Sequence, residues 1–161
     1  MADRQGVLRQ MFSYDAAALA LRIVLGLVFV FHGGQKTFGW FNFDESSGWL
    51  QWFASPRPSS GFTQTVGNFV AMGIPRPLAM AVPITEFVGG VCLIVGFLSR
   101  FWAAGLAIIM LSAIAMVHGK QGWANNELQL ALLAMSLAVF LAGPGRWAVA
   151  DLEGRLLGLS P

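Results

Sequence analysis

The chain contains four apolar segments long enough to lie within a lipid bilayer, and polar side chains lie inside or at the edges of all four. The segments cover residues 16–38, 78–98, 101–118 and 127–143. Inside the second segment, Glu86 is the single charged residue. A carboxylate at membrane depth costs about 2.5–3.5 kcal/mol even on insertion scales. We therefore expect Glu86 to face protein, water or a ligand rather than lipid.

The composition supports a membrane protein. Only 11% of the 161 residues are charged, against about 25% in soluble domains, and the mean hydropathy is +0.64. Lipid offers no hydrogen-bond partners to the backbone, so spanning segments must be helices. We expect an all-α protein that is a single domain over residues 1–161, built as a bundle of four transmembrane helices in a lipid bilayer. The net charge of +2 and the lack of a basic block argue against a nucleic-acid partner.

Two further segments are expected to lie at the bilayer surface. Within the long link 39–77, aromatic residues flank an acidic turn over residues 40–53. After it, residues 62–72 place apolar side chains at helical spacing, which predicts a short interfacial helix. The tail 148–157 predicts a second one. Lysines and arginines are slightly more numerous on the side of the two termini, which favours both termini in the cytoplasm.

The polar residues of the apolar segments converge in depth. His32, Gln35 and Lys36 share a face near the outer end of the first helix, since they lie at positions i, i+3 and i+4. Glu86 falls in the outer half of the second helix. The third helix ends at that side and the fourth begins there. We predict that Glu86 and His32 handle protons, and that five residues bind a ligand: Lys36, Gln35, His118, Arg22 and Glu127.

Each of these residues also has a structural explanation, and the alternatives stay open. Glu86 can pair with Lys36, His32 or Arg22 to hold helices together, and Arg22 is the poorest partner because it lies in the inner half. His118 can be an interfacial histidine. Lys36 and Glu127 can be ordinary charges at the membrane edge.

Pro83 and the glycines after Glu86 favour a pocket beside the acid. A proline inside a helix tends to kink it, and Gly89 and Gly90 permit close approach of a neighbour. Such a wall suits a flat, partly polar lipophile such as a quinone. The sequence contains neither a metal-ligand spacing nor a nucleotide-binding fingerprint, so the cofactor is unknown and a quinone is the candidate.

Several short motifs together resemble the DoxX family. They are LRIVLG (21–26), FHGGQK (31–36), GF (61–62), MGIP (72–75), EFVGG (86–90), GFLSR (96–100) and GPGR (143–146). The resemblance implies a four-helix protein of the bacterial cytoplasmic (inner) membrane. Family members are often described as oxidoreductases, and relatives are linked to quinone reduction with thiosulfate, to thiol or quinone stress, or to a complex with superoxide dismutase and a sulfurtransferase. The shared polar positions of the family fall on Arg22, His32, Gln35, Lys36, Glu86 and His118.

The function expected from these features is a membrane redox component that binds a quinone-like or other lipophilic molecule. Whether the chain is itself an oxidoreductase or a subunit of one stays open, and electrons would come from a redox partner protein or a substrate. The alternative is a non-catalytic scaffold or small-molecule carrier, with the function on the aromatic link. Small residues in the helices leave a homo-oligomer open.

Overall fold

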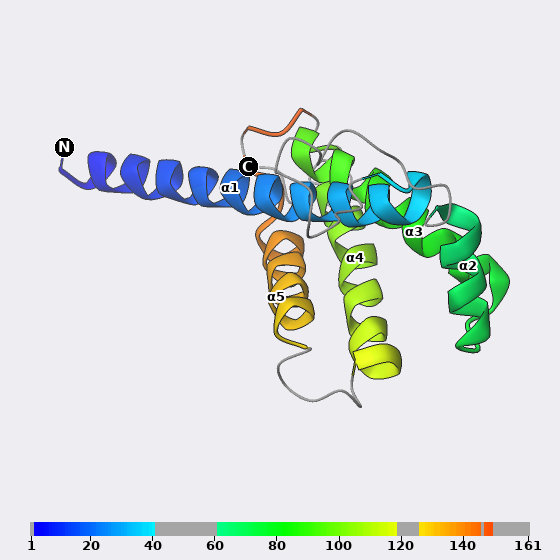
Figure 1. Ribbon diagram of the computed structural model, residues 1–161. Coiled ribbons are helices and arrows are strands. Elements are labelled where there is room, and N and C mark those ends of the chain that lie inside the picture. The colour runs from blue at the N-terminus through cyan, green and yellow to red at the C-terminus, as the bar shows by residue number, and fades with distance from the viewer. Residues whose placement is uncertain (1, 41–60, 119–125, 146, 150–161) are drawn as a thin grey trace, which may run out of the picture. The chain divides into compact units, whose positions relative to one another are not determined.

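The computed structural model of the chain describes residues 2–40, 61–118, 126–145 and 147–149, with side chains described from Met11 onward and up to Met116 in the second range. Every regular element in these ranges is a helix, which confirms the all-α prediction (Figure 1). The elements are α1 (Ala2–Phe38), α2 (Phe62–Ala71), α3 (Arg76–Val95), α4 (Ser99–Ala113), the π-helical segment η3 (Ile114–His118) and α5 (Glu127–Ala142).

Among the described residues, three helical stretches are long and apolar enough to cross a membrane: Met11–Phe38, Arg76–Val95 and Ser99–Met116. The predicted fourth span is present as the apolar helix α5, but its 16 residues reach only about 24 Å at 1.5 Å per residue. The hydrocarbon core of a bilayer is about 30 Å thick. The structure therefore supports three spans by length, while α5 falls short of one.

Helix α1 begins much earlier than the predicted segment 16–38. It starts at Ala2 and runs for 37 residues, about 55 Å, so it is longer than a bilayer requires. Residues 2–15 contain no proline, and nothing in the local sequence stops the helix. The polar first part of α1 lies before the span that begins at Met11.

The connection between α3 and α4 has three residues rather than the two expected. Gly96 adopts a positive φ of 80°, and the amides of Gly96 and Phe97 both donate to the carbonyl of Cys92 at 2.9 Å. This pattern is a glycine-dependent helix end. A side chain at Gly96 would also bring its Cβ to 2.8 Å from the Cα of Ala148. Helix α3 therefore stops at Val95, before the predicted end at residue 98.

The chain forms two compact units. The terminal unit contains residues 1–26 and 92–161, and the central unit contains residues 27–91. In the terminal unit, α4 and α5 lie side by side (Figure 1). Their buried apolar residues include Leu106 and Met110 on α4 and Leu132 and Val139 on α5. These side chains form part of the core of the terminal unit.

The predicted surface helices are described in part. Helix α2 matches the prediction for 62–72 closely, with Val66 as its buried residue. At the C-terminal end, Ala148 and Val149 are not helical, and the remainder of the predicted tail helix lies outside the described residues. Most of the aromatic link also lies outside them, since 41–60 are not described.

Candidate functional site: a buried ion pair between α1 and α3

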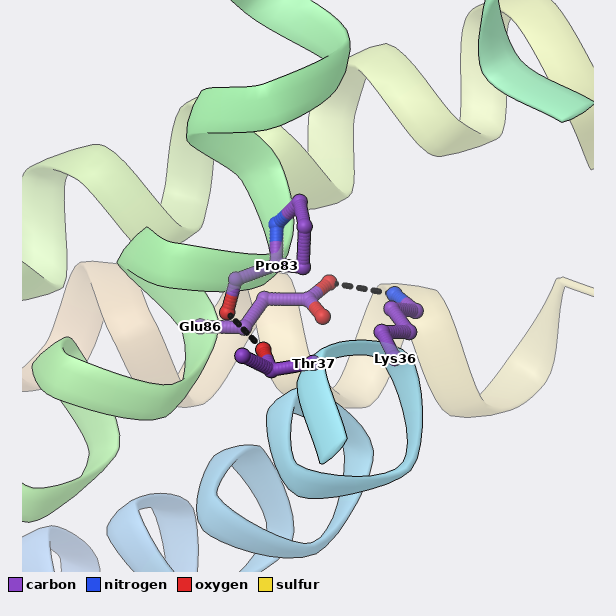
Figure 2. Close-up of polar contacts among 4 residues, drawn as sticks. All are labelled: Lys36, Thr37, Pro83 and Glu86. Atoms are coloured by element: carbon purple, nitrogen blue, oxygen red, sulfur yellow. Dashed lines mark hydrogen bonds and ion pairs between the residues drawn. The ribbon is translucent and has the colours of Figure 1, made fainter. Parts of the chain in front are cut away.

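The centre of the candidate site is an ion pair in the central unit. Lys36 Nζ, in the last turn of α1, lies 2.6 Å from Oε1 of Glu86 on α3 (Figure 2). The side chain of Glu86 is 1% exposed, whereas that of Lys36 is 31% exposed. The carboxylate is thus shielded from lipid by a cationic neighbour that itself remains partly accessible.

Gly33 allows α1 and α3 to approach closely enough for this pair. A Cβ atom at Gly33 would lie 2.7 Å from the Cα of Phe87, a separation that real side chains do not tolerate. The two backbones therefore pack against each other one turn before Lys36, as small residues permit in membrane helices. The short distance between Lys36 and Glu86 follows from this close approach.

Thr37 adds a polar contact between the same helices. Its hydroxyl donates to the carbonyl of Pro83 at 3.3 Å (Figure 2). Gly33, Lys36 and Thr37 therefore occupy positions i, i+3 and i+4 on one face of α1, and they meet Pro83, Glu86 and Phe87, which have the same spacing on α3. We call these six residues the α1–α3 seam.

The seam places Glu86 at the middle of α3 rather than in the outer half expected. Helix α3 begins at Arg76 and ends at Val95, so Glu86 lies ten residues after its start, about 15 Å along the axis. The difference arises because the helix begins two residues before the predicted segment, with Pro77 in its first turn, and because Gly96 ends it early.

Aromatic side chains lie beside Lys36 and Phe87 of the seam. The rings of Phe38 and Trp40 stack with centroids 4.3 Å apart, and the ring of Phe87 meets Phe38 edge-on at 5.1 Å. The ring of Phe69 on α2 lies with its centroid 6.0 Å from Lys36 Nζ. We call Phe38, Trp40, Phe69 and Phe87 the aromatic cluster. It places apolar, flat surfaces beside a charged pair.

One oxygen of the buried carboxylate has no partner in the part of the chain that the structure describes. Oε1 of Glu86 accepts from Lys36, but Oε2 is buried without a hydrogen bond from any described residue. Buried polar atoms are hydrogen-bonded in the large majority of cases. The second oxygen is therefore a vacant acceptor inside the seam.

His32 and Gln35 lie next to the ion pair on α1. His32 is half-buried one turn before Lys36, within electrostatic reach of both Lys36 and Glu86. Gln35 is also half-buried. The predicted grouping of His32, Lys36 and Glu86 is thus present in the central unit, with Lys36 as the direct partner of the acid.

Arg22 is bonded elsewhere. Its side chain is 0% exposed, and its guanidinium donates to the carbonyl of Leu93 at 3.3 Å and to that of Trp147 at 3.2 Å. The amide of Val149 also donates to the carbonyl of Val95 at 3.2 Å. Of the three residues considered as partners of Glu86, Lys36 is the one that forms the ion pair. Arg22 instead connects the segment after α5 to the end of α3 through its hydrogen bonds.

The remaining two predicted residues lie in the terminal unit. His118 is the last residue of the π-helical segment η3, a feature that often occurs at functional sites, but its side chain lies outside the described residues. Glu127 is exposed as the first residue of α5. A carboxylate at this position favours the helix through the dipole of the first turn, which is the structural explanation left open for Glu127.

Sequence reasoning missed Gly33 and Thr37. Gly33 entered only as part of the motif FHGGQK, and Thr37 was not considered. A signal was present, because Gly33 and Thr37 form a small-xxx-small pattern, which marks close helix contacts in membranes. Among the residues with described side chains, no group of three or more His, Cys, Asp and Glu lies together.

Together, the apolar helices and the shielded acid define a multi-pass helical membrane protein with a polar site inside its helices. The DoxX family model matches residues 17–119, more than half of the chain, and the chain belongs to the DoxX family. It is similar to the Bacillus subtilis (strain 168) protein named "Putative oxidoreductase CatD", with 26% identity over 132 residues that cover 81% of this chain and 82% of the relative. No solved structure matches the chain significantly.

Proposed function

We propose that the protein is a redox-associated component of the bacterial cytoplasmic membrane that binds a quinone-like lipophile at the α1–α3 seam. The observation that carries the proposal is the 2.6 Å contact between a fully buried Glu86 and a partly exposed Lys36. A purely structural pair needs no access, but here the lysine is accessible and one carboxylate oxygen is vacant. The family and the relative named as an oxidoreductase agree with a redox role.

The proposed roles follow from the chemistry of each side chain. Lys36 and Gln35 donate hydrogen bonds to ligand oxygens, and Glu86 and His32 exchange protons with the ligand, because a carboxylate and an imidazole are the usual acid–base groups. The aromatic cluster stacks against the ring. The proposed site leaves Arg22 out because two nitrogens of its guanidinium donate to the carbonyls of Leu93 and Trp147.

The site lies in a multi-pass protein that works with a partner. Both termini lie in the cytoplasm, α5 completes the bundle with a fourth, short span, and a redox partner protein supplies the electrons. His118, at the end of η3, is a further candidate for contact with the ligand. A homo-oligomer is compatible with the small residues on the helices.

Quinone binding by the full-length protein in lipid nanodiscs tests the proposal. A short-chain ubiquinone analogue is titrated against the unaltered protein and against Glu86→Gln, His32→Ala and Arg76→Gln, with empty nanodiscs subtracted. Arg76 is exposed at the start of α3, so its neutralisation is the matched control. We expect His32→Ala to weaken binding about ten-fold or more and Glu86→Gln to change the affinity by a similar factor, because the amide replaces an acceptor with a donor, while Arg76→Gln changes little. Absence of binding, or binding indifferent to both site changes, contradicts the proposal.

The seam favours one other function, a non-catalytic scaffold or carrier. Helix α1 is held against α3 by contacts of Gly33, Lys36 and Thr37. Such contacts between two helices are equally useful in a protein that serves only as a scaffold. Under the scaffold role, Glu86→Gln lowers the stability of the protein without any specific change in quinone binding per folded molecule. Measuring binding and stability on the same preparations separates the two functions.

A further inference from the structure

The vacant oxygen of Glu86 restricts what the seam can bind. Oε1 accepts a hydrogen bond from Lys36 Nζ, and Oε2 is buried with no hydrogen-bond partner among the described residues. In Figure 2 the carboxyl group points toward the end of α1 that carries Lys36 and Thr37, and the hydroxyl of Thr37 is already used by the carbonyl of Pro83. The missing partner must be a donor, because a carboxylate can only accept hydrogen bonds.

A quinone cannot be that donor, since its ring oxygens are acceptors. A phenol or a hydroquinone can, because each carries an O–H group on an aromatic ring. The aromatic cluster belongs to the same pair of helices: Phe87 follows Glu86 directly in α3, its ring meets Phe38 edge-on, and Phe38 stacks on Trp40. Phe38 and Trp40 are 44% and 43% exposed, so they leave ring surface available.

We infer that the seam binds its ligand in the phenolic form, with the ligand hydroxyl donating to Oε2 of Glu86. The inference rests on the proposed function and deepens it, since it names the donor-bearing, reduced ring as the preferred class. The charge balance agrees: Lys36 already neutralises Glu86, so a neutral phenol fills the vacant acceptor without adding charge. Hydrogen bonds to an ionised acceptor are shorter and stronger than neutral ones.

Two probes that differ only in whether they carry a hydroxyl donor test the inference. 4-Heptylphenol and its methyl ether, 4-heptylanisole, have the same ring and chain, but only the phenol can donate. Each is titrated calorimetrically into the full-length protein in nanodiscs, with empty nanodiscs subtracted. We expect the phenol to bind about ten-fold tighter or better than the ether. Arg76→Gln keeps this preference.

Glu86→Gln replaces the hydrogen-bond acceptor at the Oε2 position with a donor. The amide oxygen of the glutamine takes the place of Oε1 beside Lys36, so the amide NH₂ stands where Oε2 was and becomes a donor. The preference for the phenol is then lost or inverted. If Glu86→Gln does not insert into the membrane, the carboxylate stretching band of the unaltered protein replaces it: the band shifts with the phenol and not with the ether.

The outcomes are distinguishable. Equal affinity for phenol and ether in the unaltered protein overturns the inference and leaves ring binding at the seam intact, with water as the partner of Oε2. A preference that survives Glu86→Gln unchanged also overturns it, because the donor is then bound elsewhere. Failure of the phenol, the ether and the quinone analogue to bind overturns the proposed function as well.

Discussion

Lys36 and Glu86 lie 50 positions apart in the chain, yet their side chains meet at 2.6 Å in the middle of α3. The lysine comes from the last turn of α1, so the end of one helix supplies the counter-charge for the centre of another. This relationship makes a carboxylate tolerable inside an apolar helix.

Replacing Lys36 by methionine is expected to destabilise the protein. Removing one partner of a fully buried ion pair costs about 3–5 kcal/mol. The loss here should be smaller because Lys36 is 31% exposed. Reversible unfolding in mixed micelles, followed by circular dichroism, measures the change in the free energy of unfolding.

A double-mutant cycle isolates the pair. Lys36→Met combined with Glu86→Gln removes both charges, so the double variant is expected to be more stable than the sum of the single effects allows. Additive losses in this cycle would mean that the two side chains do not interact in the membrane.

Gly33→Ala is expected to open the seam. The added Cβ would lie 2.7 Å from the Cα of Phe87, and backbone atoms cannot move aside as a flexible side chain can. Loss of stability and loss of quinone binding should appear together. Gly67→Ala is the matched control, since nothing lies within 4 Å of a Cβ there, and alanine in a helix is favoured over glycine by about 0.5–1 kcal/mol. Similar behaviour of the two variants would argue against close packing at Gly33.

Thr37→Val keeps the shape of the side chain and removes its hydroxyl. The bond to the carbonyl of Pro83 is lost, and a hydrogen bond of this kind contributes about 0.5–1.5 kcal/mol. Thr37→Ser retains the donor and should restore most of the loss. The same unfolding measurement compares the unaltered protein with the two variants. If Thr37→Val were as stable as the unaltered protein, the hydroxyl of Thr37 would not contribute to the contact between α1 and α3.

Arg22→Gln is expected to release the segment after α5 without touching the seam. The guanidinium bonds to the carbonyls of Leu93 and Trp147 disappear, so the amide of Val149, which donates to Val95, loses protection. Hydrogen exchange followed by mass spectrometry should show faster exchange at Val149, by about ten-fold or more, and unchanged quinone binding. Reduced quinone binding in Arg22→Gln would instead indicate that Arg22 takes part in ligand binding.

The need for a partner at Glu86 could be predicted from the sequence, but its identity could not. A lone acid in an apolar segment requires shielding whatever the fold, so Glu86 stands out from composition and hydropathy alone. Choosing among Lys36, His32 and Arg22 requires the rotation of α1 about its axis. That rotation is set by the contact of Gly33 with Phe87, which only coordinates reveal.

The ends of the helices were harder to predict from the sequence than the presence of the helices. The apolar centres of α1, α3 and α4 are read easily from hydropathy, whereas the start of α1 at Ala2 and the end of α3 at Val95 depend on local backbone geometry. Shifting the ends of α3 by two or three residues was enough to move Glu86 from the outer half of a predicted segment to the middle of the observed helix.

The most direct test is the distance between the nitrogen of Lys36 and the carboxyl carbon of Glu86 in lipid bilayers. Solid-state NMR with ¹⁵N-lysine and ¹³C-glutamate labelling, assigned with Lys36→Met and Glu86→Gln, measures this dipolar coupling with and without the quinone analogue. We expect a strong coupling in the free protein, as the 2.6 Å contact requires, and a changed coupling or chemical shift of the pair at saturation. Absence of the coupling, or a pair indifferent to saturating ligand, would contradict a ligand site at the α1–α3 seam.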